Sequence, residues 1–115
     1  MASGTINNNA PVYFGLTSNS NLSTSGGTGL FFPESNTVVV FGEASSGSNI
    51  TTSTVLATIP TGYRPSASRS IAGRYTTDAN ANSATMSVNI NTDGTIKQSS
   101  SNALRSISFF GAYQL

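Results

Sequence analysis

The chain contains no cysteine, no histidine and no tryptophan, and only 8% of its 115 residues are charged. Without cysteine, the sequence encodes neither a disulfide framework nor a zinc site of the usual kind. Without histidine, it lacks the base that most nucleophilic triads use. The formal net charge of +1 offers no electrostatic attraction to nucleic acid. No apolar run approaches the roughly 20 residues that a membrane-spanning helix needs.

Carboxylates are equally scarce, since the chain has only Glu34, Glu43, Asp78 and Asp93. A glycosidase needs two paired carboxyl groups, but Asp93 falls in a turn signal and the two glutamates flank a valine-rich strand. Residues 78–82 begin like a calcium loop, yet Ser83 stands where glycine is required and Asn89 where a bidentate glutamate is required. The sequence therefore predicts a protein that is not an enzyme and has no metal ion or other cofactor.

Uncharged polar residues dominate what is present. The chain has 20 Ser, 15 Thr and 12 Asn, together 47 of 115 residues, alongside six Phe and four Tyr. Disordered chains of this polarity usually carry charge and lack aromatic residues, so the sequence predicts a folded domain whose surface is hydrated without being ionised. The length suits one domain. We assign residues 1–10 to a flexible lead-in or linker and residues 11–115 to a single β head domain.

Short runs of β-forming residues, separated by turn signals, predict about seven or eight strands. The expected strands are 11–16, 29–32, 37–41, 54–59, 70–75, 85–91, 95–98 and 106–115, with polar loops at 17–29, 44–51 and 76–82. Asp93-Gly94 predicts a primed hairpin turn, because glycine supplies the positive φ that such a turn needs. No helical periodicity is present. The predicted fold is all-β, a compact antiparallel β-barrel or jelly-roll-like sandwich.

Two of these strands are apolar on both faces. Val39 and Phe41 in one strand, and Phe110 and Ala112 in the other, occupy the face that a small antiparallel sheet normally exposes to water. Loops of a compact barrel can cover such a face, or a second subunit can. The low charge of the chain suits an obligate oligomer.

The segments 59–65 (IPTGYRP), 88–96 (VNINTDGTI) and 107–109 (ISF) together resemble the C-terminal head domains of bacteriophage tail receptor-binding proteins, of the lactococcal siphophage baseplate type. The resemblance covers residues 54–115. It implies a homotrimer of β heads in the virion, at an extracellular tail fibre tip or baseplate, that mediates host adsorption. It also implies saccharide binding to the host cell wall, often to a phosphate-containing polysaccharide, and attachment to other tail proteins through a preceding N-terminal part.

Saccharide sites combine an aromatic ring with planar donors and acceptors, and arginine suits phosphate. One segment and the start of the last strand contain all of these groups, which gives the predicted ligand-binding residues Arg69, Arg74, Tyr75, Asp78, Asn80, Asn82 and Arg105. Arg74 and Asp78 can equally form a surface ion pair. The corner at 60–65 has a mechanical explanation in proline and glycine geometry, with ligand contact by Tyr63 or Arg64 as the alternative. Two other functions stay open, a structural trimerisation or decoration domain without ligand and a monomeric carbohydrate-binding module.

Overall fold

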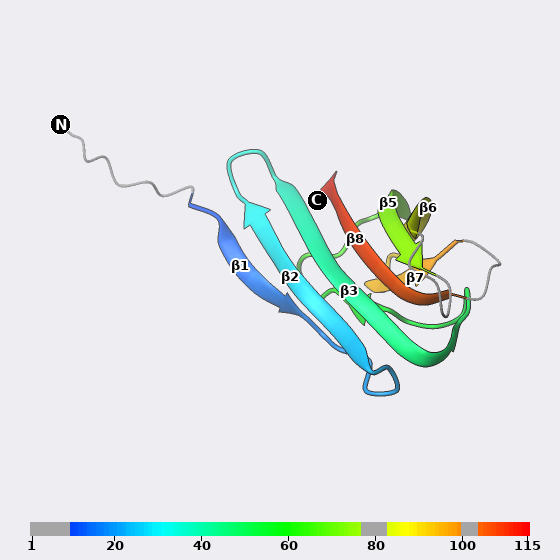
Figure 1. The fold of residues 1–115 in the computed structure, drawn as a ribbon. Coiled ribbons are helices and arrows are strands. Elements are labelled where there is room, and N and C mark those ends of the chain that lie inside the picture. The colour runs from blue at the N-terminus through cyan, green and yellow to red at the C-terminus, as the bar shows by residue number, and fades with distance from the viewer. Residues whose placement is uncertain (1–9, 77–82, 100–103) are drawn as a thin grey trace.

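The computed structural model describes residues 10–76, 83–99 and 104–115, and every strand pair in them is antiparallel (Figure 1). The strands are β1 (Val12–Leu16), β2 (Thr24–Phe32), β3 (Thr37–Ile50), β4 (Ala57–Thr58), β5 (Arg69–Thr76), β6 (Ser83–Ile90), β7 (Thr95–Gln98) and β8 (Leu104–Gln114). The predicted lead-in at 1–10 and loop at 76–82 lie almost entirely outside the described residues.

The eight strands form one sheet in the order β1-β2-β3-β8-β5-β6-β7-β4. Its two ends meet through reciprocal hydrogen bonds, because the Thr17 amide donates to the Thr58 carbonyl at 2.8 Å and the Thr58 amide donates to the Thr17 carbonyl at 2.9 Å. Figure 1 shows the sheet curling round, with β1, β2, β3 and β8 side by side in front and β5, β6 and β7 beyond β8. The result is a nearly closed barrel, so the predicted all-β antiparallel barrel is confirmed.

The interior of this barrel is filled by alternate residues of each strand, as strand geometry requires. Val38, Val40 and Ala44 of β3 are fully buried, and Ile107 and Phe109 of β8 face them from the neighbouring strand. In β6 the predicted alternation is confirmed: Val88 and Ile90 are fully buried, and Met86 packs against the same core. The opposite set of residues on β3 and β8 therefore faces outward.

Three of the predicted boundaries are wrong. Residues 24–29 belong to β2 rather than to a loop, β3 continues to Ile50 through the loop predicted at 44–51, and the strand predicted at 54–59 is reduced to Ala57–Thr58. The first two segments are rich in serine and glycine, so they show no hydrophobic pattern typical of a strand. They still pair as strands, because main-chain hydrogen bonds do not depend on apolar side chains. Glycine even favours the pairing, since a Cβ on Gly27 would lie 2.2 Å from the carbonyl oxygen of Phe41.

The Asp93-Gly94 hairpin is present, but the primed turn is wrong. A type I′ turn needs positive φ at both central residues, whereas Gly94 has φ 87° and Asp93 is not among the described residues with positive φ. The Asn91 amide donates to the Thr95 carbonyl, and the Gly94 amide donates to the Asn91 carbonyl, both at 2.9 Å. These bonds define a three-residue loop with a left-handed glycine at its end. The Asp93 carboxylate, which accepts from the Thr95 amide, holds the turn from outside.

The corner at 60–65 links the barrel's two ends. Gly62 has φ 107°, and the Tyr63 amide donates to the Pro60 carbonyl at 3.2 Å, which closes a tight turn. The Tyr63 ring stacks on Phe14 of β1 with a centroid separation of 4.2 Å, and Arg64 Nε donates to the Ile59 carbonyl at 2.8 Å. These contacts agree with the mechanical explanation of the motif, because both side chains are engaged within the fold.

Candidate functional site

The predicted site residues on β5 point to different sides of the sheet. Arg74 faces outward and is exposed, whereas Tyr75 is half-buried and packs against the core. Both still line a small hollow of about 140 Å³ with Thr76, Ser106 and Ser108. Arg69 is exposed at the first position of β5, opposite Ile90. The remaining predicted residues of this segment, Asp78, Asn80 and Asn82, lie outside the described residues.

Arg105 is hydrogen-bonded to the C-terminal part of β3. Its Nη1 donates to the Gly47 carbonyl at 2.9 Å, and its Nε donates to Asn49 Oδ1 at 3.3 Å. These bonds hold the β3 segment where the register with β8 shifts, between Ser45 and Ile50. The Arg105 side chain is thus engaged within the fold.

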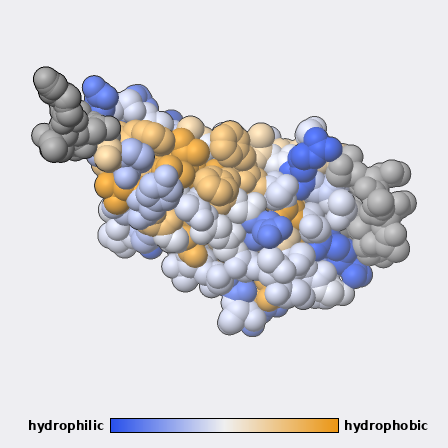
Figure 2. All heavy atoms as spheres, turned by 60° about the vertical axis from the view of Figure 1, so that its left-hand side comes forward, coloured by the Kyte–Doolittle hydropathy of each residue, from blue (hydrophilic) through white to orange (hydrophobic). Residues whose placement is uncertain are grey.

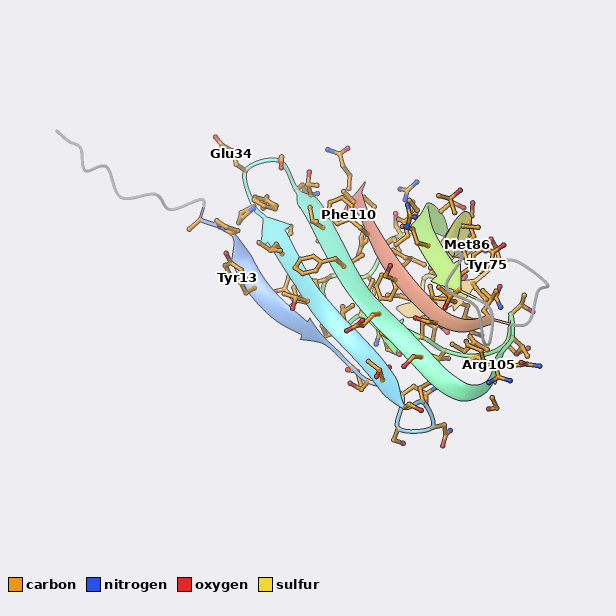
Figure 3. All side chains as sticks on the ribbon, viewed as in Figure 1. Tyr13, Glu34, Tyr75, Met86, Arg105 and Phe110 are labelled. Carbon is orange, nitrogen blue, oxygen red and sulfur yellow. The ribbon has the colours of Figure 1, made fainter. Side chains whose placement is uncertain are left out.

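An apolar surface crosses the outer face of the wall formed by β1, β2, β3, β8 and β5. Strand register places its residues in two adjacent rows. We call them the apolar band, and its members are Tyr13, Leu30, Val39 and Ala112 in one row and Phe41, Phe110 and Ala72 in the next. Tyr13 is 71% exposed, Phe110 64% and Phe41 41%. Figure 3 shows Tyr13 and Phe110 standing on β1 and β8, at two places across the wall.

No described segment covers the apolar band. Figure 2 shows hydrophobic surface gathered on the half of the molecule nearer the N-terminal trace, and hydrophilic side chains on the other half. Of the two explanations for the two-sided strands, cover by loops therefore does not apply to the described residues. A contiguous exposed patch with large aromatic side chains is typical of interaction surfaces.

A polar row follows the apolar band along the same strands. Glu43 of β3 lies opposite Ser108 of β8, Ser108 lies opposite Arg74 of β5, and Arg74 lies opposite Thr85 of β6. All four residues are exposed. The outer face thus changes from apolar to polar between one cross-strand row and the next. In the polar row, the Glu43 carboxylate lies on one side of Ser108 and the Arg74 guanidinium lies on the other.

Two hollows flank β8 at this polar row. The larger, of about 570 Å³, has Glu43 and Phe41 on one side and Ser18 and Ser25 on the other, and its floor includes Gly26. The second, of about 450 Å³, is formed by Arg74, Thr85, Ala72 and Phe110. Ser108 and Phe109 line both hollows. Both are within the size range of small-molecule sites in proteins. The first has a mixed polar and apolar lining, the second is mostly apolar, and each is bordered by an exposed phenylalanine.

The sequence pattern missed Glu43 and Ser108 as site residues. Glu43 adjoins a segment that was predicted to be a loop, and Ser108 is one of many serines in the chain. Neither has a local signal, because their proximity depends on the pairing of β3 with β8. The available clue was that Glu43 and Ser108 occupy outward-facing positions of their strands. They share those faces with Phe41 and Phe110, whose apolar side chains the sequence analysis had recognised as unusual there.

Among the described residues, two titratable groups have shifted pKa values, and both belong to the barrel's turns and seam. The Thr95 hydroxyl donates to Asp93 Oδ1 at 2.7 Å, and this bond, helped by the Thr95 amide, lowers the pKa of the Asp93 carboxyl. Burial raises the pKa of Tyr113 to about 12, and its hydroxyl donates to the Tyr63 carbonyl. Both shifts have causes within the barrel itself.

The described residues contain no group of three or more acidic, histidine or cysteine side chains that could hold a metal ion. The described part of the chain also contains no helix long and apolar enough to cross a membrane. No protein-family model matches the chain, and no curated protein matches it significantly.

Proposed function

We propose that this chain is the receptor-binding head of a bacteriophage tail or baseplate, that it assembles as a homotrimer, and that it binds a host cell-surface saccharide. The observation that carries the proposed assembly is the apolar band. Soluble monomers rarely expose a contiguous apolar patch with large aromatic residues, and the band spans five hydrogen-bonded strands with Tyr13 71% and Phe110 64% exposed. A closed symmetric assembly removes such a surface from water.

The number of subunits and the ligand class come from the resemblance of residues 54–115 to phage head domains. The surface composition supports the ligand class, since hydroxyl and amide side chains predominate and few charges compete. A shallow polar site gains little apolar burial, so each head binds weakly. Three heads on one axis raise the overall affinity for a repetitive cell-wall polymer without any new contact.

The proposal is tested first by sedimentation equilibrium of the full chain, which should give three times the chain mass. A monomer at micromolar concentration contradicts the assembly. A glycan array carrying host cell-wall fragments then tests ligand binding, with adsorption to host cells as the functional measurement. A trimer that binds no glycan on the array contradicts the receptor-binding role.

A second candidate function is a structural trimerisation or decoration domain without ligand. The apolar band favours it as much as the first, because assembly alone accounts for the band. A monomeric carbohydrate-binding module is disfavoured by the same surface, since a monomer leaves Tyr13 and Phe110 in water. The two measurements above separate the three functions, because each predicts a different combination of mass and glycan binding.

A further inference from the structure

We infer that the saccharide site of this chain is a third hollow, at the C-terminal end of β3, and that it recognises an N-acetylated sugar through the acetamido group. The inference rests on the proposed saccharide-binding function and names the site and the ligand class. None of the residues that line this hollow belongs to the segment 69–82, where the site was expected.

Three segments that are distant in the sequence meet at this hollow. The turn between β1 and β2 contributes Asn21 and Leu22, the C-terminal part of β3 contributes Ser46 and Asn49, and the turn between β3 and β4 contributes Ser53 and Val55. Figure 1 shows the first turn and this part of β3 at the same end of the sheet, opposite the turn between β2 and β3. The volume of about 380 Å³ is within the range of small-molecule sites.

The hollow lies apart from the apolar band. No residue of the band lines it. Along β3, the lining residue nearest to the band is Ser46, five residues after Phe41, and this separation corresponds to about 16 Å of extended strand. A subunit interface on the band therefore need not cover the hollow, so assembly and ligand binding are compatible.

Hydrogen bonds within the chain fix the walls of the hollow. Asn19 Nδ2 donates to the Val55 carbonyl at 2.9 Å, and Asn19 Oδ1 accepts from the Asn21 amide at 3.0 Å, so this side chain joins the two turns. On β3, Arg105 Nε donates to Asn49 Oδ1 at 3.3 Å. A site whose walls are already ordered loses less conformational entropy when a ligand binds.

The groups that stay available to a ligand are two amides and a hydroxyl. Within the described part of the chain, the side chains of Asn21 and Ser53 and the Nδ2 group of Asn49 form no hydrogen bond, and all three residues are exposed. An acetamido group carries one N–H donor and one carbonyl acceptor. A carboxamide side chain pairs with both, because it has an acceptor oxygen and two N–H donors.

The apolar part of the lining suits the methyl of an acetamido group. Leu22 and Val55 are both half-buried, and the lining contains no aromatic ring. The broad face of a sugar ring packs best on an aromatic side chain, whereas a single methyl group is small enough to be removed from water by two aliphatic side chains. A sugar without the acetyl group leaves both the amides and this apolar surface unused.

The test uses the assembled full chain and immobilised oligosaccharides of N-acetylglucosamine and of N-acetylgalactosamine, each with the counterpart that lacks the acetyl group. At least one N-acetylated probe should bind about fivefold or more tightly than its counterpart, since the counterpart lacks the carbonyl and the methyl. Asn21→Asp and Asn49→Asp should each weaken that binding about fivefold, because each replaces an N–H donor with an acceptor.

Asn89→Asp is the matched control. Asn89 lies on β6 outside the hollow, and its Oδ1 accepts from the Ser70 hydroxyl at 3.1 Å, so the substitution removes the same donor and keeps the accepted bond. Binding by this variant should equal that of the parent. Thermal melting of all three variants should match that of the parent, and Asn21→Asp decides if Asn49→Asp alone melts early.

The outcomes separate the site, the ligand class and the function. Unchanged binding in Asn21→Asp and Asn49→Asp overturns the hollow and leaves the proposed function intact. Equal binding with and without the acetyl group overturns the ligand class, as does binding to host cell-wall fragments without binding to either N-acetylated probe. No binding to any probe or host fragment overturns the function as well.

Discussion

Tyr113 and Gly94 illustrate how single residues hold the seam of this barrel. The Tyr113 hydroxyl reaches from β8 to the carbonyl of Tyr63 in the corner, so the last strand is tied to the segment that joins the two ends of the sheet. Gly94 belongs to the β6–β7 turn through its amide and carbonyl. It lies against the same corner, because Arg64 packs beside its Cα. Neither residue is expected to tolerate substitution well, and in both cases the reason is local. At Gly94 the reason is steric, and at Tyr113 it is electrostatic.

Replacing Gly94 with valine should destabilise the protein by about 1–3 kcal/mol, since a β-branched residue is strained at positive φ. Gly94 has φ 87°, and an added Cβ would lie 2.5 Å from the Ile59 carbonyl oxygen and 2.6 Å from Arg64 Nε. Chemical denaturation measures the loss. Gly15→Ala is the matched control, because a Cβ there meets nothing within 4 Å. Equal stability of the Gly94→Val variant and the parent contradicts the turn geometry.

Stability should fall as the pH rises from 10 toward 12, and Tyr113 should account for part of that fall. Burial raises the pKa of Tyr113 to about 12 in the folded chain, above the value near 10 of an unfolded tyrosine. Between these values the unfolded state releases a proton that the folded state retains, so the free energy of unfolding decreases with pH. Unfolding measured across this range should depend less steeply on pH in Tyr113→Phe. An unchanged slope in that variant contradicts the assignment.

At the scale of elements, β1 is held at the barrel seam by side chains more than by main-chain bonds. Its described connection to β4 is a single bridge between Thr17 and Thr58. Phe14 compensates, since its ring stacks on Tyr63 at 4.2 Å and covers Gly29 of β2, where an added Cβ would lie 2.1 Å from the ring. The glycine leaves room for the ring, and the ring shields the main chain of the neighbouring strand.

Phe14→Ala should therefore destabilise the seam specifically. We expect a loss of about 2–3 kcal/mol, below the range for a fully buried phenylalanine because this ring is only half-buried. Hydrogen exchange should accelerate at the amides of Thr17 and Thr58, which form the bridge. Val12→Ala, two residues earlier on the same strand and 42% exposed, should change neither measurement much. Unchanged exchange at the bridge in Phe14→Ala would show that the stacked ring does not hold the seam.

For the whole molecule, the outer face of the curved wall is divided into an apolar half and a polar half. Under the proposed function, the apolar band is the surface on which the subunits meet. Phe41 and Phe110 form its row next to the polar row, where β3 pairs with β8. Substitutions at these two residues are therefore expected to affect assembly.

Phe110→Asp should convert the assembly to monomers while leaving the barrel folded. The side chain is 64% exposed, so the substitution changes the stability of the isolated chain by no more than about 0.5 kcal/mol. A charge within an apolar interface, by contrast, is left without a partner when the subunits associate. Sedimentation equilibrium measures the mass, and circular dichroism measures the fold. Thr52→Asp, which adds the same charge to an exposed turn between β3 and β4, should remain assembled.

Several features of this protein follow from local sequence alone. Alternation over residues 85–91 identified the inward side chains of β6, the apolar residues on both faces of β3 and β8 identified four of the seven members of the band, and Asp93-Gly94 identified a hairpin. Each of these signals is carried by side chains close together in the chain. Strand periodicity and glycine's access to positive φ are properties of a few successive residues, so no tertiary information was needed to recognise them.

Other features were decided only when the strands paired. The length of β2 and β3 and the alignment of Glu43, Ser108 and Arg74 depend on hydrogen bonds between distant segments. Serine and glycine in residues 24–27 and 45–49 have weak strand preference, and the ladder that orders them is formed by main-chain groups that every residue type except proline carries. Register is a relation between two strands, so a row that crosses several strands has no signature within any one of them.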